Sequence, residues 1–223
     1  MFARSIALLG EECFRKLQSA HILVVGIGGV GGAVVEVLAR TGAQNITLVD
    51  GDVVSLSNLN RQIFATQSNI GHPKVLEMKN RILSINPNAS VDTIFEFVSE
   101  QNIDKIVDPK FDYIIDCIDD INAKALLANS AKQKRIPIAS ALGAGNRMGL
   151  PSFEMMDIFE TSYDPLAKVF RKKLRENNIS SLDVCAPKAQ VDKKLSPPAS
   201  VMWQPMTCGA VLSAFVIDKI IKK

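Results

Sequence analysis

Three glycines are spaced as they are in phosphate-binding turns. Gly26, Gly28 and Gly31 form a GxGxxG pattern between an apolar run at 21–26 and a helical pattern at 30–41. The first glycine permits the tight bend, the second lets a phosphate approach the backbone, and the third lets helix and strand pack closely. The helix N-terminus adds amide dipoles that attract anions. The pattern predicts a bound nucleotide, and a glycine-rich turn without a ligand is the alternative.

An acidic residue follows the glycines at the separation expected for ribose binding. Asp50 ends a second apolar run at 45–49. A carboxylate about 20 residues beyond the turn can accept hydrogen bonds from ribose hydroxyls. NAD and ATP both carry such a ribose, so these two features leave both nucleotides open.

The polar segment between residues 50 and 74 favours ATP. It contains Asn58, Arg61, Gln62 and Lys74, so two cations and several amides lie close in sequence to the turn. Attack of a carboxylate on an α-phosphate needs positive charge over the triphosphate, whereas a hydride-transfer enzyme needs few cations at its cofactor. Arginine can chelate phosphate oxygens, and lysine acts as a point charge. The alternative for each cation is a solvated surface position.

Two carboxylates end another predicted strand. Asp116 and Asp119 lie in the run DCIDD at the end of the apolar residues 111–117. The carboxyl ends of parallel strands meet at the edge where ligands bind in open α/β folds, and a carboxylate there can hold Mg²⁺ against phosphates. The alternative for Asp119 or Asp120 is to cap the following helix. That role for one of them is compatible with metal binding by the other.

Strands and helices alternate along the first two thirds of the chain. Short β-branched runs predict the strands, and apolar residues at helical spacing predict the helices. The predicted strands lie at 21–26, 45–49, 90–98, 111–117 and 136–141, and the predicted helices at 30–41, 73–85, 101–107 and 121–133. Such βαβ units form a mostly parallel sheet covered on both faces. We therefore predict an α/β fold with a Rossmann-like, doubly wound sheet.

The alternation changes after Gly149. The predicted elements are then a strand at 151–158, a helix at 164–177, a loop at 184–198 and a helix at 208–221. We place a boundary here without a linker. Residues 1–149 are expected to form the ATP-binding domain. Residues 150–223 are expected to form a C-terminal extension of the same compact unit that serves substrate binding and dimerisation.

Composition excludes several classes of protein. The 223 residues carry a formal net charge of +3, so overall charge does not indicate nucleic-acid binding. The four cysteines include no CxxC pair, which argues against a zinc ribbon and a disulfide scaffold. The sequence contains no run of about 18 uncharged apolar residues, so it predicts no membrane span. These features predict a cytoplasmic protein without zinc.

Cys185 could be a nucleophile or a structural thiol. A catalytic thiol needs a partner that lowers its pKa, most often a histidine. The two histidines, His21 and His72, lie in the first strand and in the predicted nucleotide loop. The sequence therefore favours a structural thiol.

Positive charge is concentrated after residue 164. One short predicted helix carries five cations, and lysines follow at 188, 193 and 194. The cations of the helix are Lys168, Arg171, Lys172, Lys173 and Arg175. Such a cluster can hold a polyanion such as tRNA through its phosphates. The alternative is a solvated helix face.

Taken together, these motifs resemble the ubiquitin-activating-enzyme-like superfamily, which includes bacterial activators of the molybdopterin and thiamine sulfur carriers. The resemblance covers about the first 140 residues. It rests on GIGGVGG at 26–32, LVDGD at 48–52, SNLNRQ at 57–62, GHPK at 71–74, INPN at 85–88 and DCIDD at 116–120.

The resemblance implies ATP as cofactor and assigns residues to it. Arg61, Lys74 and Asp119 match catalytic residues of the superfamily, and Asp119 matches its Mg²⁺-associated aspartate. Arg4 matches an arginine that is supplied across a dimer interface to the partner's γ-phosphate, so a homodimer is expected. The nucleotide is expected to contact Gly26, Gly28, Gly29, Gly31, Asp50, Asp52, Asn58, Arg61, Gln62, Lys74, Asp116 and Asp119.

The second half of the chain looks similar to the tRNA threonylcarbamoyladenosine dehydratase branch. The motifs are GAGNR at 143–147, DPLAKVFRKKLRE at 164–176 and ASVMWQP with CGAVLSAFVIDKII near the end. Members of that branch activate the threonyl carboxylate of a modified adenosine in tRNA, and an internal attack then closes a ring. The resemblance implies this activity, with tRNA as the substrate, and leaves open whether a sulfur-transfer protein cooperates.

Three other functions stay open. An adenylyltransferase of a sulfur-carrier or ubiquitin-like protein would share the first step. A catalytically silent scaffold of the same fold is disfavoured by Arg61, Lys74 and Asp119. An NAD oxidoreductase is disfavoured by the same cations.

Overall fold

A seven-stranded sheet runs through the computed structural model, which describes residues 1–162, 164–193, 195–196 and 198–223. The strand order is β3-β2-β1-β4-β5-β7-β6, and only β6 runs antiparallel to its neighbour among the described strands. The strands are β1 His21–Val25, β2 Asn45–Val49, β3 Ser90–Ile94, β4 Tyr113–Asp116, β5 Ile138–Ala141, β6 Phe153–Asp157 and β7 Asp183–Pro187. The predicted α/β fold with a mostly parallel, doubly wound sheet is confirmed.

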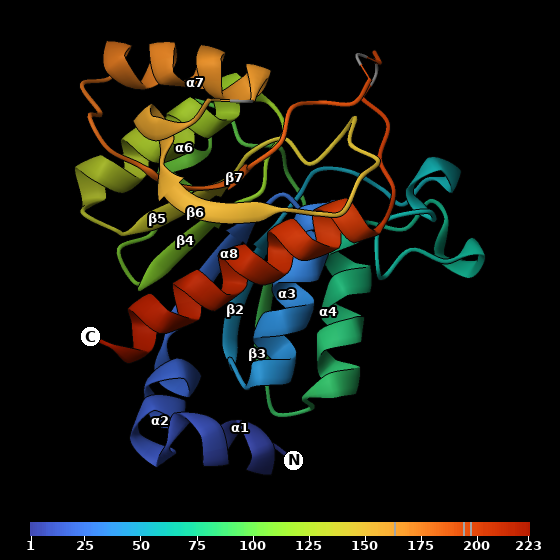
Figure 1. The fold of residues 1–223 in the computed structure, drawn as a ribbon. Coiled ribbons are helices and arrows are strands. Elements are labelled where there is room, and N and C mark those ends of the chain that lie inside the picture. The colour runs from blue at the N-terminus through green and yellow to red at the C-terminus, as the bar shows by residue number, and fades with distance from the viewer. Residues whose placement is uncertain (163, 194, 197) are drawn as a thin grey trace.

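Helices cover both faces of this sheet (Figure 1). The N-terminal helices α1 and α2 precede β1. On one face of the sheet α3 and α4 pack with α8. On the other face α5 and α6 pack against the sheet, and α7 lies over α6. The helices are α1 Ala3–Leu9, α2 Glu11–Ser19, α3 Gly29–Thr41, α4 Lys74–Ile85, α5 Ile103–Ile106, α6 Ile121–Lys134, α7 Pro165–Glu176 and α8 Trp203–Ile221.

Strand β1 shows why this arrangement forms. Ile22 and Val24 belong to the core under α3, α4 and α8, whereas Leu23 and Val25 belong to the core under α5 and α6. Successive side chains of a strand point to opposite faces, so an uninterrupted apolar run suits a strand buried on both sides. The two cores hold β1 at the centre of the sheet, and its carboxyl end leads directly into the glycine turn.

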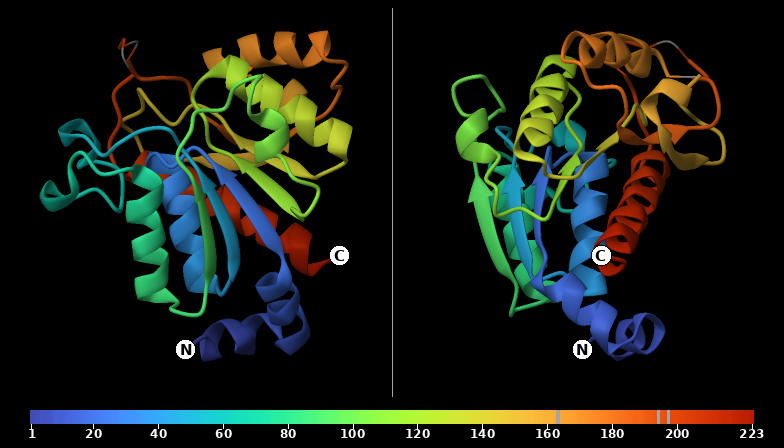
Figure 2. Two further views of the ribbon diagram at one scale, coloured as in Figure 1. Left: turned by 180° about the vertical axis from the view of Figure 1, so that it is seen from behind. Right: turned by 90° about the vertical axis from the view of Figure 1, so that its left-hand side faces the viewer.

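The C-terminal extension continues the same sheet. Strand β7 pairs with β5 in parallel and with β6 in antiparallel orientation. Helix α8 packs against α3 and crosses it obliquely (Figure 1 and Figure 2), and a Cβ atom at Gly209 would lie 2.7 Å from Cβ of Ala33. Among the described residues, α8 is the one helix long and apolar enough to cross a membrane, and half of that stretch is buried inside the fold.

The prediction of a loop at 184–198 is wrong for its first residues, because β7 occupies Asp183–Pro187. Pro187 and the lysines that follow it suggested a loop. In the structure, Pro187 is the last residue of the strand, and Val184, Cys185 and Ala186 are buried between the neighbouring strands. Proline is tolerated where a strand has an unpaired edge, and the pairing of β7 with β5 ends at Cys185, before Pro187. Of the lysines predicted to line the loop, Lys194 lies outside the described residues.

Candidate nucleotide-binding site

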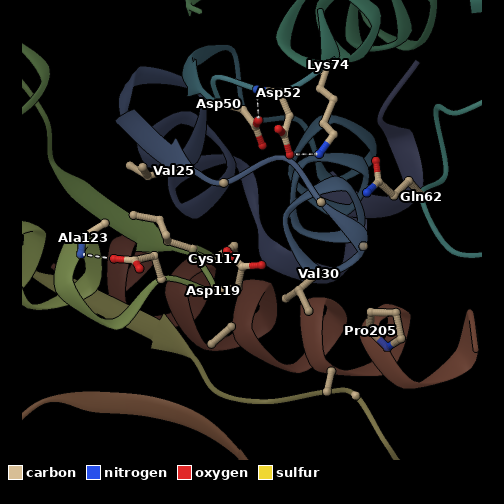
Figure 3. Close-up of a pocket in the computed structure, with 18 of the residues that line it drawn as sticks. Val25, Val30, Asp50, Asp52, Gln62, Lys74, Cys117, Asp119, Ala123 and Pro205 are labelled. Atoms are coloured by element: carbon tan, nitrogen blue, oxygen red, sulfur yellow. Dashed lines mark hydrogen bonds and ion pairs between the residues drawn. The ribbon is translucent and has the colours of Figure 1, made fainter. Parts of the chain in front are cut away.

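A cavity of about 730 Å³ opens at the carboxyl ends of β1, β2, β4 and β5. Its walls come from the glycine turn, the end of β2, the segment 58–62, the start of α4, the loop after β4 and residues 141–145 after β5. Figure 3 shows these elements converging on one space, with the side chains of Lys74, Gln62 and Asp119 around it. The cavity therefore brings together most of the residues predicted to bind a nucleotide.

The glycine turn owes its shape to positions where no side chain fits. Gly26 has φ of 89°, and a Cβ atom there would lie 2.7 Å from the carbonyl group of Cys117. A Cβ atom at Gly31 would lie 1.8 Å from the carbonyl oxygen of Gly26. At Gly28 the nearest side-chain atom would be 4.0 Å away, on Gln62. Backbone atoms thus pack tightly against Gly26 and Gly31, whereas Gly28 is open toward the cavity.

Asp50 is fixed by the backbone at the end of β2. One carboxylate oxygen accepts a hydrogen bond from the amide of Ile27 at 2.6 Å, and the other accepts one from the amide of Asp52 at 2.8 Å. Burial raises the pKa of Asp50, and the nearby Lys74 partly opposes that rise. Each carboxylate oxygen keeps a second lone pair, so Asp50 can still accept hydrogen bonds from a ribose.

Lys74 reaches the cavity from the first turn of α4. Its Nζ atom lies 2.7 Å from Oδ2 of Asp52. The lysine side chain is 7% exposed and that of Asp52 is 55% exposed. The backbone reinforces the pair, because the amide of Lys74 donates to the carbonyl of Asp52. A buried cation is thus held beside the glycine turn.

The segment 58–62 places an amide, a guanidinium group and a second amide around the turn. Asn58 closes a capping box with Ser55 and is buried. Arg61 is half-buried, and its Nη1 atom donates to the carbonyl of Ser57 at 2.6 Å. Gln62 is buried, and its Oε1 atom has no hydrogen-bond partner among the described residues. Arg61 thus retains hydrogen-bond donors for a ligand, and Gln62 retains an acceptor.

The three aspartates of the DCIDD run have separate positions. Asp120 caps α6 by accepting a hydrogen bond from the amide of Ala123 at 2.8 Å. Asp119 is exposed in the cavity wall and has no hydrogen-bond or ion-pair partner within the part of the chain that the structure describes. The structure thus assigns the capping role to Asp120 and leaves Asp119 available to a ligand.

Asp116 does not line the cavity. It is fully buried beneath the floor, where its Oδ2 atom lies 2.9 Å from Nζ of Lys124 and 2.7 Å from Oγ of Ser140. A direct contact between Asp116 and a nucleotide, as predicted from the sequence, does not fit this position. Burial of the last residue of β4 is the physical reason, because its side chain points into the core below the cavity.

Arg4 lies far from this cavity within one chain. It is exposed on α1, which stands at the amino end of β1, whereas the cavity is at the carboxyl ends of the strands (Figure 1). A contact between Arg4 and a nucleotide therefore requires a second chain.

The basic helix α7 begins beside the cavity and runs away from it. Leu166 lines the cavity, and Asp164 accepts a hydrogen bond from the amide of Gly143 at 2.7 Å. Arg171 is turned inward and donates to the carbonyl of Thr161 at 3.0 Å. The exposed cations of the helix are Lys168, Lys172 and Arg175, while Lys173 is partly buried. Four of the five cations therefore remain available to solvent, and Arg171 mainly supports the preceding turn.

Cys185 is unsuited to nucleophilic attack. It is fully buried, and its Sγ atom lies 3.6 Å from Sγ of Cys208. His72 bonds to Glu77 instead. Cys117 lines the cavity, but burial raises the pKa of its thiol, so it is neutral at ordinary pH. These contacts agree with the structural interpretation of Cys185.

Sequence reasoning missed two parts of the site. Lys124, within α6, is fully buried under the loop that carries Asp119. Phe97 lines the cavity from the segment after β3 and covers Gly51. A lysine among the apolar residues of a helix was the available signal for Lys124. Phe97 lay inside the strand predicted at 90–98, but β3 ends at Ile94, so the sequence carried no signal for its place in the cavity wall.

The sheet, the glycine turn and the cations beside it define a nucleotide-binding protein of the Rossmann-like class. The chain belongs to the ThiF family, whose sequence profile matches residues 2–154. The tRNA threonylcarbamoyladenosine dehydratase of Bacillus subtilis is 34% identical over 240 aligned positions, which cover 99% of this chain and 94% of that protein. The molybdopterin-synthase adenylyltransferase of Haemophilus influenzae is 34% identical over 172 positions, which cover 77% of this chain and 68% of that protein.

Solved structures show the same likeness. The crystal structure of Escherichia coli tRNA N6-threonylcarbamoyladenosine dehydratase in complex with AMP is 32% identical and superposes with a TM-score of 0.93, covering 99% of this chain and 94% of that chain. The same enzyme in complex with ATP gives a TM-score of 0.92 at 31% identity, covering 99% of this chain and 93% of that chain.

Proposed function

We propose that this protein is an ATP-dependent dehydratase that activates the carboxylate of threonylcarbamoyladenosine in tRNA for cyclisation. The observation that carries the proposal is the extent of the likeness to the dehydratases. It covers 99% of the chain and so includes β6, α7, β7 and α8 beyond the nucleotide-binding part. The sequences of the Escherichia coli dehydratase and of the adenylyltransferase align over similar shares of the chain, 79% and 77%, so the distinction rests on the full-length matches.

The cavity suits ATP in one orientation. Phosphates over the open side of the glycine turn would meet amides at Gly28 and Gly29 and the N-terminus of α3. Lys74 and Arg61 would neutralise phosphate oxygens, Asn58 and Gln62 would help to position them, and the ribose would bind Asp50. This arrangement supports the ATP-binding role that the sequence predicts for these residues.

Asp119 fits a magnesium ion that arrives with ATP. The described residues contain no group of three or more His, Cys, Asp or Glu side chains that could hold a metal alone. Mg²⁺ in nucleotide sites is typically held by one or two carboxylates together with phosphates and water. An exposed, unpartnered carboxylate in the wall of a phosphate cavity meets that requirement. When bound, the ion would neutralise phosphate charge.

The residues of the chain then have defined tasks. A carboxylate oxygen of the substrate attacks either the α-phosphorus of ATP, which releases pyrophosphate, or the γ-phosphorus, which releases ADP. In both cases a mixed anhydride of the carboxylate and a phosphate group forms. Lys74 and Arg61 stabilise the charge that develops in this step. A nucleophile within the threonylcarbamoyl group then attacks the activated carbon, and AMP or phosphate leaves with one carboxylate oxygen. Proximity within the substrate replaces an enzyme nucleophile.

The parts outside the cavity support a tRNA substrate and a dimer. The exposed cations of α7 start beside the cavity mouth, so they could hold tRNA phosphates while the modified base enters. Arg4 would act on the ATP of a second chain in a homodimer, because α1 is too far from the cavity of its own chain. Residues 150–223 would then serve substrate binding and dimerisation. A tRNA substrate would place the protein in the cytoplasm. A sulfur-transfer protein could cooperate, but the proposed reaction does not require one.

One comparison separates this function from its rivals. Purified protein is incubated with ATP, Mg²⁺ and either tRNA containing threonylcarbamoyladenosine or a small ubiquitin-like protein that ends in glycine. We expect AMP or phosphate release to rise with the modified tRNA and not with unmodified tRNA or the small protein. Pyrophosphate release that only the small protein stimulates would establish an adenylyltransferase, because the AMP stays on the adenylated product. No release of AMP, phosphate or pyrophosphate with either substrate would favour a silent scaffold.

A further inference from the structure

A buried ion pair holds the loop that carries Asp119. Nζ of Lys124 lies 2.9 Å from Oδ2 of Asp116, and both side chains are 0% exposed. Lys124 Nζ also donates to the carbonyl of Ile118 at 3.0 Å, and the amide of Ile118 donates to Oδ1 of Asp116 at 3.0 Å. The peptide groups on both sides of Ile118 are therefore bound to the pair, and Asp119 is the next residue.

The same loop packs against the glycine turn. A Cβ atom at Gly26 would lie 2.7 Å from the carbonyl of Cys117 and 2.9 Å from the amide of Ile118. At its other end, Asp120 is fixed as the cap of α6. Between these anchors only the Asp119 side chain faces the cavity without a partner among the described residues (Figure 3). The ion pair thus sets the position of Asp119 relative to the phosphate turn.

Stability alone is a weak explanation for this pair. Desolvation of two charges can cost as much as their attraction returns, and apolar replacements of buried ion pairs are often neutral or stabilising. Lys124 also makes contacts that a simple pair does not need. Its Nζ atom lies 5.7 Å from the ring centre of Phe170 on α7, so the lysine joins the loop after β4 to the C-terminal extension.

We propose that Lys124 is a positioning residue, which acts through Asp116 and Ile118 to hold Asp119 where it can bind the Mg²⁺ of ATP–Mg²⁺. The inference rests on the proposed function only in taking ATP–Mg²⁺ as the ligand. It does not depend on what the activated carboxylate belongs to. Groups that orient a metal ligand typically contribute 10–100-fold to metal affinity or activity.

The test uses Lys124→Met, with Lys132→Met as the matched control. Lys132 lies on the same helix but is exposed, and it bonds only to the carbonyl of Asn178 among the described residues. Two readouts are taken without tRNA: hydrogen exchange of the amides at 117–120, and ATP affinity as a function of Mg²⁺ concentration. We expect Lys124→Met to speed exchange in this loop and to raise the Mg²⁺ concentration at half-maximal ATP binding about tenfold. Lys132→Met should change neither.

A double-mutant cycle with Asp119→Ala separates positioning from general stability. If Lys124 acts through Asp119, then Lys124→Met added to Asp119→Ala should cause little further loss of Mg²⁺-dependent ATP binding. Additive losses, or an unchanged Mg²⁺ dependence in Lys124→Met, would overturn the proposal. Lys124→Met/Asp116→Asn, which leaves no unpaired charge in the core, replaces Lys124→Met in the cycle if the single variant does not fold.

Failure of the proposed function would look different. In that case the protein without substitutions would not dehydrate threonylcarbamoyladenosine in tRNA. The Mg²⁺ dependence of its ATP binding would still change in Lys124→Met.

Discussion

Lys74 and Asp52 form a salt bridge of 2.7 Å in which the lysine is buried and the aspartate is largely exposed. The cation is therefore held beside the glycine turn before any phosphate arrives. Asp52 partly compensates the positive charge of Lys74, and solvent or a ligand can reach the exposed aspartate. A triphosphate that enters the cavity can share the lysine without having to order it first.

This relationship predicts the effect of removing the cations at the phosphates. Lys74→Ala and Arg61→Ala should each lower the rate of substrate-dependent AMP or phosphate release by about 10²–10³, because each removes a preorganised charge from the transition state. Lys79→Ala provides a control, since Lys79 lies on the same helix and outside the cavity. Single-turnover assays measure the rates. Near-normal turnover in both cavity variants would exclude the phosphate role.

Arg4 should act on the ATP of a second chain. Arg4→Ala and Lys74→Ala homodimers are each expected to be nearly inactive. A mixture of the two chains should regain part of the activity, because one of its two composite sites contains both Arg4 and Lys74. Differently tagged chains allow the heterodimer to be isolated before the assay. No recovery in a verified heterodimer would rule out action across the interface.

The exposed cations of α7 should bind tRNA through its phosphates. Lys168→Ala/Lys172→Ala should weaken tRNA binding and reduce the slope of the logarithm of affinity against the logarithm of salt concentration by about 0.7–0.9 for each lost contact. ATP affinity should stay nearly unchanged. Lys105→Ala/Lys110→Ala, which removes the same charge from another exposed surface, should leave tRNA binding nearly unchanged. Equal effects of the two double variants would make the helix an ordinary solvated surface.

Glu36 should stabilise the fold in a pH-dependent way. Burial alone would raise the pKa of Glu36, but hydrogen bonds and charges from Arg81 and Arg40 together hold it below its ordinary value of 4.5. A carboxyl group whose pKa is lowered on folding contributes stability above its unfolded pKa, and this contribution is lost as pH falls through the folded value. Glu36→Gln should therefore lower the free energy of unfolding at pH 7 by about 1–3 kcal/mol.

Urea unfolding at several pH values tests this prediction. The difference between the original protein and Glu36→Gln should be constant above about pH 5 and should shrink as pH falls below the ordinary pKa. A difference that stays constant down to pH 3 would show that the carboxylate charge is not the source of the stability.

The sequence predicted those features that depend on local order. The apolar run of β1, the glycine turn and the acidic end of β2 follow one another in the chain, and the structure has them where the spacing placed them. Features that depend on distant partners were harder to predict. Strand β7 forms because β5 and β6 flank it, although Pro187 within it favoured a loop.

Two charged residues show the same limit within the site. Asp116 ends β4 beside the cavity, but Lys124 and Ser140 hold it below the floor, and neither partner adjoins it in sequence. Arg171 belongs to a basic run, but its guanidinium group binds the carbonyl of Thr161 ten residues earlier. Residue type and spacing indicated the edge of the sheet that carries the site, whereas side-chain direction was decided by tertiary contacts.

The most direct test of the proposed function follows the oxygen atoms of the substrate. tRNA that carries threonylcarbamoyladenosine labelled with ¹⁸O in the threonyl carboxylate is incubated with the purified protein, ATP and Mg²⁺. Mass spectrometry is then applied to the nucleosides and to the released nucleotide or phosphate. We predict an ATP-dependent product lighter by one labelled water, with one ¹⁸O atom in AMP or in inorganic phosphate. Lys74→Ala should form this product about 10²–10³ times more slowly. An unchanged nucleoside in the presence of bound ATP–Mg²⁺, or a dehydrated product with no label in either AMP or phosphate, would contradict the proposal.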